Sequence, residues 1–181
     1  EFLTQEAEFD TALADTAAEY GRVIAGEYEF GSTTDTLIDS FYGIGSLRVE
    51  AFNGVPRRVP FLKGSERPPI SILAAGILSD DMVSETITQN QGFWISYNHP
   101  MGYFTTFSFS EVLNASEGRI ADSRRTPLSI VQGKVVLVGM DLPGIDRHPF
   151  PNTLRRKIPG VYGQAFAIDT ILSGSQLDTI P

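Results

Sequence analysis

The chain of 181 residues contains no cysteine and only two histidines, His99 and His148. The absence of cysteine excludes disulfides, thiolate metal sites and cysteine nucleophiles, but it does not indicate a compartment. A serine hydrolase needs an activated serine, a histidine base and an acid, and the chain has no Gly-x-Ser-x-Gly motif. We therefore expect no catalytic serine chemistry, and we expect that the domain itself is not an enzyme.

Long apolar runs and extended basic stretches are also missing. The longest apolar stretch, residues 70–78, is far shorter than the ~18 residues needed to cross a bilayer. The net charge is −8, and basic residues cluster only in short groups such as residues 155–157. Nucleic-acid binders carry a basic patch or stripe, so we do not expect nucleic acid as a partner.

The remaining composition is that of one globular domain. Hydrophobic residues make up 41% of the chain and charged residues 20%. A length of 181 residues fits one domain of ~100–200 residues, so residues 1–181 are interpreted as a single domain. The acidic charge is concentrated at the start, because residues 1–40 hold ten acidic side chains and one basic.

The first predicted element is a helix that ends at Gly21 and leads into a short strand at residues 22–25. Apolar side chains spaced at helical intervals predict it: Phe9, Leu13, Ala17 and Tyr20. A second helix is predicted over residues 70–78, and an aromatic-rich strand over residues 92–97. A short helix over residues 110–115 has Ser108 or Ser110 as its cap.

Residues 46–62 predict a β-hairpin. The Asn53-Gly54 dipeptide is the strongest short-range signal of a hairpin turn. Pro56 and Pro60 lie in the second arm, and proline lacks the N–H that a central strand donates. We therefore expect the second arm to be an edge strand or an irregular one.

The last fifty residues predict a strand, a long loop and a helix. Residues 133–139 form a continuous apolar run, which is typical of a strand buried on both faces of a parallel sheet. A loop of about twenty residues follows, and a helix begins near Gly160 and ends at Gly174. The whole pattern predicts an α/β fold: a three-layer sandwich with a mixed, mostly parallel sheet and helices on its faces.

Several segments in fixed order resemble one family. Residues 52–60 are similar to its characteristic hairpin, and residues 133–139 are similar to its closing strand. Gly144-x-Asp146 and then Pro159-Gly160-Val161 match its closing signature, which continues to residue 172. The family is the second type of CHASE domain, the sensory extracellular domains associated with cyclases and histidine kinases. The resemblance covers roughly residues 9–180.

This resemblance implies an extracytoplasmic sensor domain of a bacterial receptor, such as an adenylate or guanylate cyclase or a histidine kinase. It implies an unknown small-molecule ligand, a homodimer, and membrane helices after the last residues. Family members usually carry histidine where this chain has Gln164. They also usually begin earlier, with a further strand and helix, so we expect an unpaired sheet edge here.

The loop after the predicted strand at 133–139 is the expected ligand site, because ligands bind beyond the carboxyl ends of parallel strands. The start of the last helix and the cations before it favour a small anion. In the alternative interpretation, these cations lie in a solvated loop and bind no ligand. The candidate ligand-binding residues are Asp141, Asp146, His148, Arg155, Arg156, Gly160 and Gln164.

A metal site built from Asp141, Asp146 and His148 is a weaker hypothesis, because a lone Asp-x-His lacks specific spacing. In the alternative, Asp146 holds its loop through hydrogen bonds to backbone amides. We expect neither a metal nor a cofactor. Two other functions stay open: a periplasmic α/β hydrolase-like enzyme, and a dimerisation module without a ligand.

Overall fold

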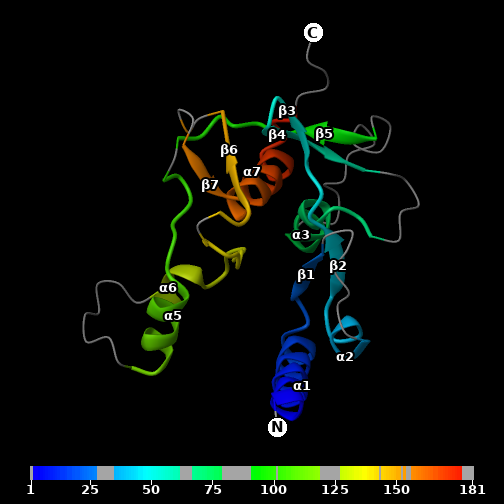
Figure 1. Ribbon diagram of the computed structural model, residues 1–181, viewed down its shortest axis with the longest axis vertical. Helices are drawn as coiled ribbons and strands as arrows, with labels where there is room; N and C mark the ends of the chain where they lie inside the picture. Colours follow the sequence, from blue (N-terminus) through cyan, green and yellow to red (C-terminus); the bar gives the residue numbers. More distant parts are fainter. Residues whose placement is uncertain are drawn as a thin grey trace.

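The computed structural model describes residues 2–27, 35–61, 67–78, 91–100, 102–118, 127–142, 144–151, 153 and 156–176. Helices and short strands are interspersed along this part of the chain, which confirms a mixed α/β fold (Figure 1). The helices are α1 (Phe2–Tyr20), α2 (Asp35–Ile38), α3 (Ile70–Leu78), α5 (Phe109–Ser116), α6 (Pro127–Val131) and α7 (Val161–Leu172). The strands are β1 (Ile24–Glu27), β2 (Gly43–Ser46), β3 (Glu50–Phe52), β4 (Val55–Pro60), β5 (Gly92–Trp94), β6 (Arg147–Pro149) and β7 (Lys157–Pro159).

The described strands form three small sheets. β1 and β2 pair in parallel, β3-β4-β5 form an antiparallel sheet, and β6 and β7 form an antiparallel hairpin. The sheets are small and mostly antiparallel, so the expected three-layer sandwich with a mostly parallel sheet is not confirmed. The β6–β7 hairpin lies in the segment for which the sequence predicted only a loop.

The predicted strand at residues 133–139 is wrong for this structure. Gly133 adopts a φ of 68°, and residues 135–139 run on without joining any described sheet. Val135, Val136 and Val138 are 41%, 55% and 84% exposed. A continuous apolar run indicates a segment suited to burial on both faces. It does not determine which neighbouring strand would form hydrogen bonds with that segment.

The predicted hairpin is confirmed. Asn53 and Gly54 both adopt left-handed backbone conformations, with φ of 53° and 75°, as a two-residue type I′ turn requires. The second arm was expected to be an edge strand or an irregular one. It is not an edge strand, because β4 lies between β3 and β5, but its pairing with β3 is irregular, with a register shift between Glu50 and Ala51. Pro60 is the last residue of the strand, and Pro56, its second residue, lies opposite Ala51.

The first helix and its stop are confirmed, with β1 beginning at Ile24 rather than at residue 22. Gly21 has a φ of 65°, and its N–H donates to the Ala17 carbonyl at 2.9 Å. Of the predicted apolar stripe only Ala17 is buried, whereas Phe9 and Tyr20 are exposed. Within the described residues, only a narrow part of the apolar face of α1 is therefore packed against the rest of the domain.

Helices α3 and α5 match their predictions closely. The Pro69 carbonyl accepts the Ile72 N–H at 3.0 Å in the first turn of α3. Strand β2 packs closely on that turn, because a Cβ added to Gly45 would lie 2.5 Å from the Ile70 Cα. Helix α5 begins with a capping box between Ser108 and Glu111.

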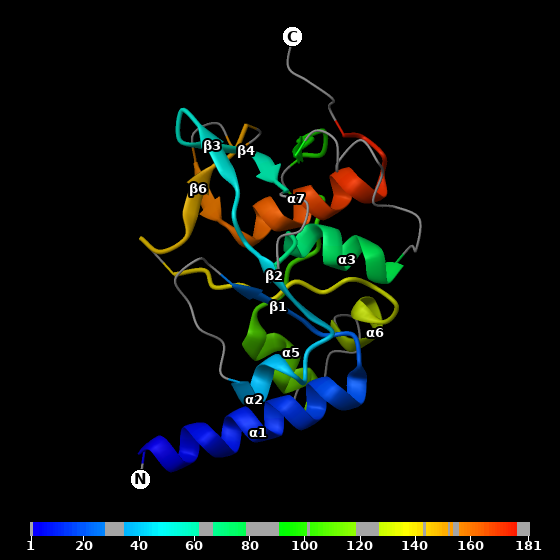
Figure 2. The same cartoon turned by 90° about the vertical axis from the view of Figure 1, so that its right-hand side faces the viewer.

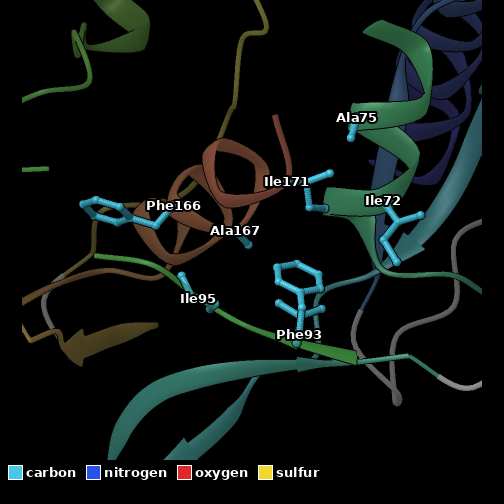
Figure 3. Packing of buried hydrophobic residues seen from close by; sticks show 8 residues of the cluster. Ile72, Ala75, Phe93, Ile95, Phe166, Ala167 and Ile171 are labelled. Atoms are coloured by element: carbon cyan, nitrogen blue, oxygen red, sulfur yellow. The ribbon is translucent and has the colours of Figure 1, made fainter. Parts of the chain in front are cut away.

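The core lies where α3 and α7 pack together over the β3-β4-β5 sheet (Figures 1 and 2). Phe93 and Ile95 point from the β5 region toward α7 and α3 (Figure 3). The Phe166 ring lies 5.0 Å from the rings of both Tyr97 and Phe104. The buried cluster consists of Val59, Ile72, Ala75, Phe93, Ile95, Phe166, Ala167 and Ile171.

Candidate functional site

A pocket of about 310 Å³ lies between residues 47–56, which include β3 and the start of β4, and the start of α7. Three segments that are far apart in the sequence meet around it: residues 47–56, residues 146–150 and residues 160–164. Its lining residues are Leu47, Arg48, Val49, Ala51, Pro56, Asp146, His148, Phe150, Gly160, Gly163 and Gln164. The walls are mostly apolar, with a few polar side chains, as in many small-molecule sites.

Four of the seven candidate residues line this pocket: Asp146, His148, Gly160 and Gln164. Asp141 and Arg156 do not line it. Asp141 forms an ion pair with Arg147, and Arg156 is exposed. Arg155 lies outside the described residues.

Asp146 is held in the pocket by contacts of both its backbone and its side chain. Its φ is 47°, a left-handed conformation that Asp and Asn adopt more readily than most residues. Its Oδ1 lies 3.0 Å from His148 Nε2, within hydrogen-bond distance. Its backbone carbonyl accepts the Gly160 N–H at 2.7 Å, and a Cβ at Gly160 would collide with its carboxylate. A side chain at position 160 would therefore have to displace the Asp146 carboxylate.

The geometry at the start of α7 gives no support to an anion site there. The Gly160 N–H already donates to Asp146, and the Asp146 carboxylate stands directly against Gly160. A negative charge at a helix N-terminus is favourable, and Asp146 itself supplies it. Arg156 and Lys157 are exposed and do not line the pocket.

Gln164 joins two distant parts of the chain. Its Nε2 donates to the Leu47 carbonyl at 3.0 Å, which ties α7 to the connection between β2 and β3. Leu47, Arg48 and Val49 form the opposite wall of the pocket. The sequence did not predict this wall, because nothing local in residues 47–49 indicates that α7 lies against them.

Tyr97 contacts two of the residues that line the pocket. Its hydroxyl donates to the Pro56 carbonyl at 2.9 Å, and its ring lies 5.7 Å from the ring of Phe150. Pro56 and Phe150 are both lining residues. Burial raises the pKa of Tyr97 above its ordinary value, and the nearby Arg57 partly opposes that rise. The phenol is therefore protonated, and it stays a hydrogen-bond donor at neutral pH.

The metal hypothesis is not supported by the arrangement of its residues. Asp141 pairs with Arg147, whereas Asp146 pairs with His148. No group of three or more His, Cys, Asp or Glu side chains gathers in a way that could hold a metal ion in the part of the chain that the structure describes. The second histidine, His99, belongs to another cluster, where it lies 3.2 Å from Asp169 and stacks on Tyr103.

The CHASE2 domain family model matches residues 2–180, essentially the whole chain. The chain therefore belongs to the CHASE2 family, a family of sensory extracellular domains. No curated protein and no solved structure matches this chain. Within the described residues, no helix has both the length and the apolar character needed to span a membrane.

Proposed function

We propose that this domain is the extracytoplasmic signal-input part of a bacterial transmembrane receptor and that it binds a small ligand in the pocket. The receptor would be an adenylate or guanylate cyclase or a histidine kinase, with membrane helices following the domain. Membership of a sensory family supports the input role. The pocket, lined by Asp146, His148 and Gln164, carries the ligand-binding part of the proposal.

The lining indicates the kind of ligand. A volume of about 310 Å³ is at the lower end of the ~300–1,000 Å³ of ligand pockets, so the ligand is a small metabolite. Val49, Pro56 and Phe150 offer apolar walls, and the side chains of Arg48 and Asp146 carry opposite charges. A small apolar amino acid matches this lining, because it combines an apolar side chain with one positive and one negative group.

Signalling in this scheme needs no catalysis by the domain. A ligand shifts a conformational equilibrium only by its differential affinity for two states. We propose that the two states differ in the contacts of a homodimer and that the difference passes to the membrane helices. Steady turnover of a substrate by the purified domain would contradict this part of the proposal.

The experiment that tests ligand binding is a thermal-shift screen of the purified domain with amino acids, amines, carboxylates and sugars. A ligand at a hundred times its Kd stabilises the folded state by about 2.7 kcal/mol, which raises Tm by several degrees. The matched variants are Asp146→Asn and Arg156→Ala. Asparagine tolerates the left-handed backbone and retains the carbonyl that Gly160 N–H reaches.

We expect a ligand found in the screen to bind at least about tenfold more weakly to Asp146→Asn, because each lost charged contact costs about 1.4 kcal/mol or more. Arg156 is exposed and outside the pocket, so Arg156→Ala should bind it unchanged. Equal weakening in both variants, or no shift with any compound, would contradict the pocket as the ligand site.

One observation favours the dimerisation module as a second candidate. Large apolar side chains are exposed on α1 and α5, among them Phe9, Tyr20 and Phe109. Exposed apolar patches commonly mark protein interfaces. A dimer that forms with rising concentration, together with a flat ligand screen, would favour this candidate over the sensor of a small molecule.

A further inference from the structure

Helix α1 exposes a line of side chains, called here the α1 stripe: Phe9, Leu13, Thr16 and Tyr20. Phe9 and Tyr20 are 74% and 76% exposed, and Leu13 is 50% exposed. The spacing of four, three and four residues is that of the a and d positions of paired helices. Thr16 adds no unsatisfied donor, because its hydroxyl donates to the Ala12 carbonyl at 2.8 Å. The α1 stripe therefore has the form of a contact surface for a second helix.

The rest of the domain packs on a different side of α1. Among residues 9–20, only Ala14 and Ala17 are buried, where the helix packs on α2. At about 100° per residue, these two alanines lie about a quarter turn around the helix from the α1 stripe. Figures 1 and 2 show α1 at the lower end of the molecule, with the body of the domain above it. The α1 stripe is thus open to a partner that lies beside α1.

The charges on α1 allow a second copy of the chain to be that partner. Residues 1–20 contain acidic side chains but no basic one, so self-pairing requires that the acids stay away from the contact. In a parallel pair, residue 12 of one copy lies across from residue 17 of the other, at positions that set partner choice. Both residues are alanine, and Asp15 lies on the far side of the helix. Two α1 stripes can therefore meet without opposed carboxylates.

The place of the domain body favours parallel rather than antiparallel helices. Packed helices lie about 8–10 Å apart. In an antiparallel pair, the two-fold axis is perpendicular to the helices and leaves both bodies on the same side, where they would collide. In a parallel pair, the axis runs along the helices and places the bodies on opposite sides.

We propose that the α1 stripe is the homodimer surface of this domain and that it pairs in parallel with the α1 stripe of a second copy. The inference rests on the homodimer of the proposed function and names its surface. Helix α5 offers a shorter surface, because it exposes only Phe109 and Leu113 among its large apolar side chains. The seam is short, so it buries less than the ~1,200 Å² at the low end of stable interfaces. Anchoring two copies in one membrane would raise their effective concentration.

The first test measures the mass of the purified domain by sedimentation equilibrium. A weak interface predicts a mass that rises from monomer toward dimer between about 10 µM and about 1 mM. Leu13→Glu places two carboxylates against each other in the seam and should raise the Kd of the dimer at least about tenfold. The matched control is Ala18→Glu, which adds the same charge on the exposed far side of α1 and should leave this Kd within about twofold.

Each other result would overturn the proposal. A domain that stays monomeric up to about 1 mM would assign the α1 stripe to a different protein and would contradict the proposed homodimer as well. A dimer that is weakened by Leu113→Glu on α5, but not by Leu13→Glu, would overturn the α1 surface and leave the homodimer standing. No ligand enters these measurements, so a flat ligand screen is a separate result.

The cysteine-free sequence allows a test of the parallel orientation. In a parallel pair, residue 13 lies across from residue 13 of the second copy, within the ~4.4–6.8 Å between Cα atoms that a disulfide spans. Under mild oxidation, Leu13→Cys should form disulfide-linked dimers at least about tenfold faster than the control Ala18→Cys, as followed by non-reducing electrophoresis. Equal rates would overturn the proposal. Linkage only between Leu13→Cys and Thr16→Cys chains in a mixture would overturn the parallel arrangement.

Discussion

The packed centre of the molecule and its two lower parts differ in how much of their apolar surface they cover (Figures 1 and 2). In the centre, Phe166 and Ile171 of α7 are fully buried against α3 and the aromatic rings around Tyr97. Below it, Phe9 on α1 and Phe109 on α5 are mostly exposed. Helices of both regions carry apolar stripes, so the difference lies in whether a partner surface is present.

This comparison shows where stability and where conformational change should reside. Regions with few buried apolar contacts open at low free energy, whereas core elements open only with global unfolding. We therefore expect α3 and α7 to set the stability of the domain. The exposed faces of α1 and α5 are where dimer contacts can occur.

The largest expected effect is the loss of a central ring. Phe166→Ala should lower the free energy of unfolding by about 3–5 kcal/mol, because it removes a buried ring and leaves a cavity. Phe109→Ala on α5 is the control and should change it by no more than about 0.5 kcal/mol. Urea denaturation of both variants checks this, and similar losses would abolish the distinction between the two regions.

Two glycines should respond with opposite signs to substitution by alanine. Gly45→Ala should destabilise the domain by about 1–3 kcal/mol, because the added methyl group meets the Ile70 backbone at 2.5 Å. Gly76→Ala in α3 should stabilise it by up to about 1 kcal/mol, since nothing lies near that position and alanine favours helices. The melting temperatures of the two variants, each compared with that of the unaltered domain, test this prediction. Stabilisation by Gly45→Ala would show that β2 does not pack closely on α3.

Tyr97 should make stability fall at high pH. Its folded pKa is raised above the ordinary value of 10.0. Its stabilising contribution is therefore complete below pH 10 and is lost as pH rises toward the folded pKa. Tyr97→Phe should cost about 1 kcal/mol at pH 7 through the hydrogen bond to Pro56. It should also flatten the decline between pH 10 and 11, as followed by urea denaturation. An unchanged alkaline slope would contradict the burial of this phenol.

The smallest expected effect is at the cap of α5. Ser108→Ala removes the side chain that accepts the Glu111 N–H, which typically costs about 1 kcal/mol of helix stability. Because α5 lies outside the core, we expect faster amide hydrogen exchange confined to residues 109–116. A spread of faster exchange into α7 would show that α5 is coupled to the core.

Locally encoded features could be predicted from the sequence. Asn53-Gly54 specifies its hairpin turn, Ser108 its cap, and Gly21 and Gly174 the ends of their helices, because each acts through neighbouring residues. The β6–β7 hairpin was missed because residues 147–149 and 157–159 are too short and too rich in proline and charge to show alternation.

Long-range features of the site could be predicted only in part. Asp146, His148, Gly160 and Gln164 were candidates because of their place around the final loop and helix, and the structure brings them to one pocket. The wall at residues 47–49 depends on the contact between Gln164 and Leu47, which are 117 positions apart. Such a contact depends on how the whole chain packs, and no local sequence pattern predicts it.

The most direct test of the central claim is to fill the pocket. Ala51→Trp places a large side chain at an exposed lining position of β3, and Phe52→Trp, on the other face of the strand, is the matched control. Calorimetric titration with the best compound from the ligand screen should show binding to Phe52→Trp as to the unaltered domain, and none to Ala51→Trp. Undiminished binding to a folded Ala51→Trp would contradict the claim that this pocket receives the signal.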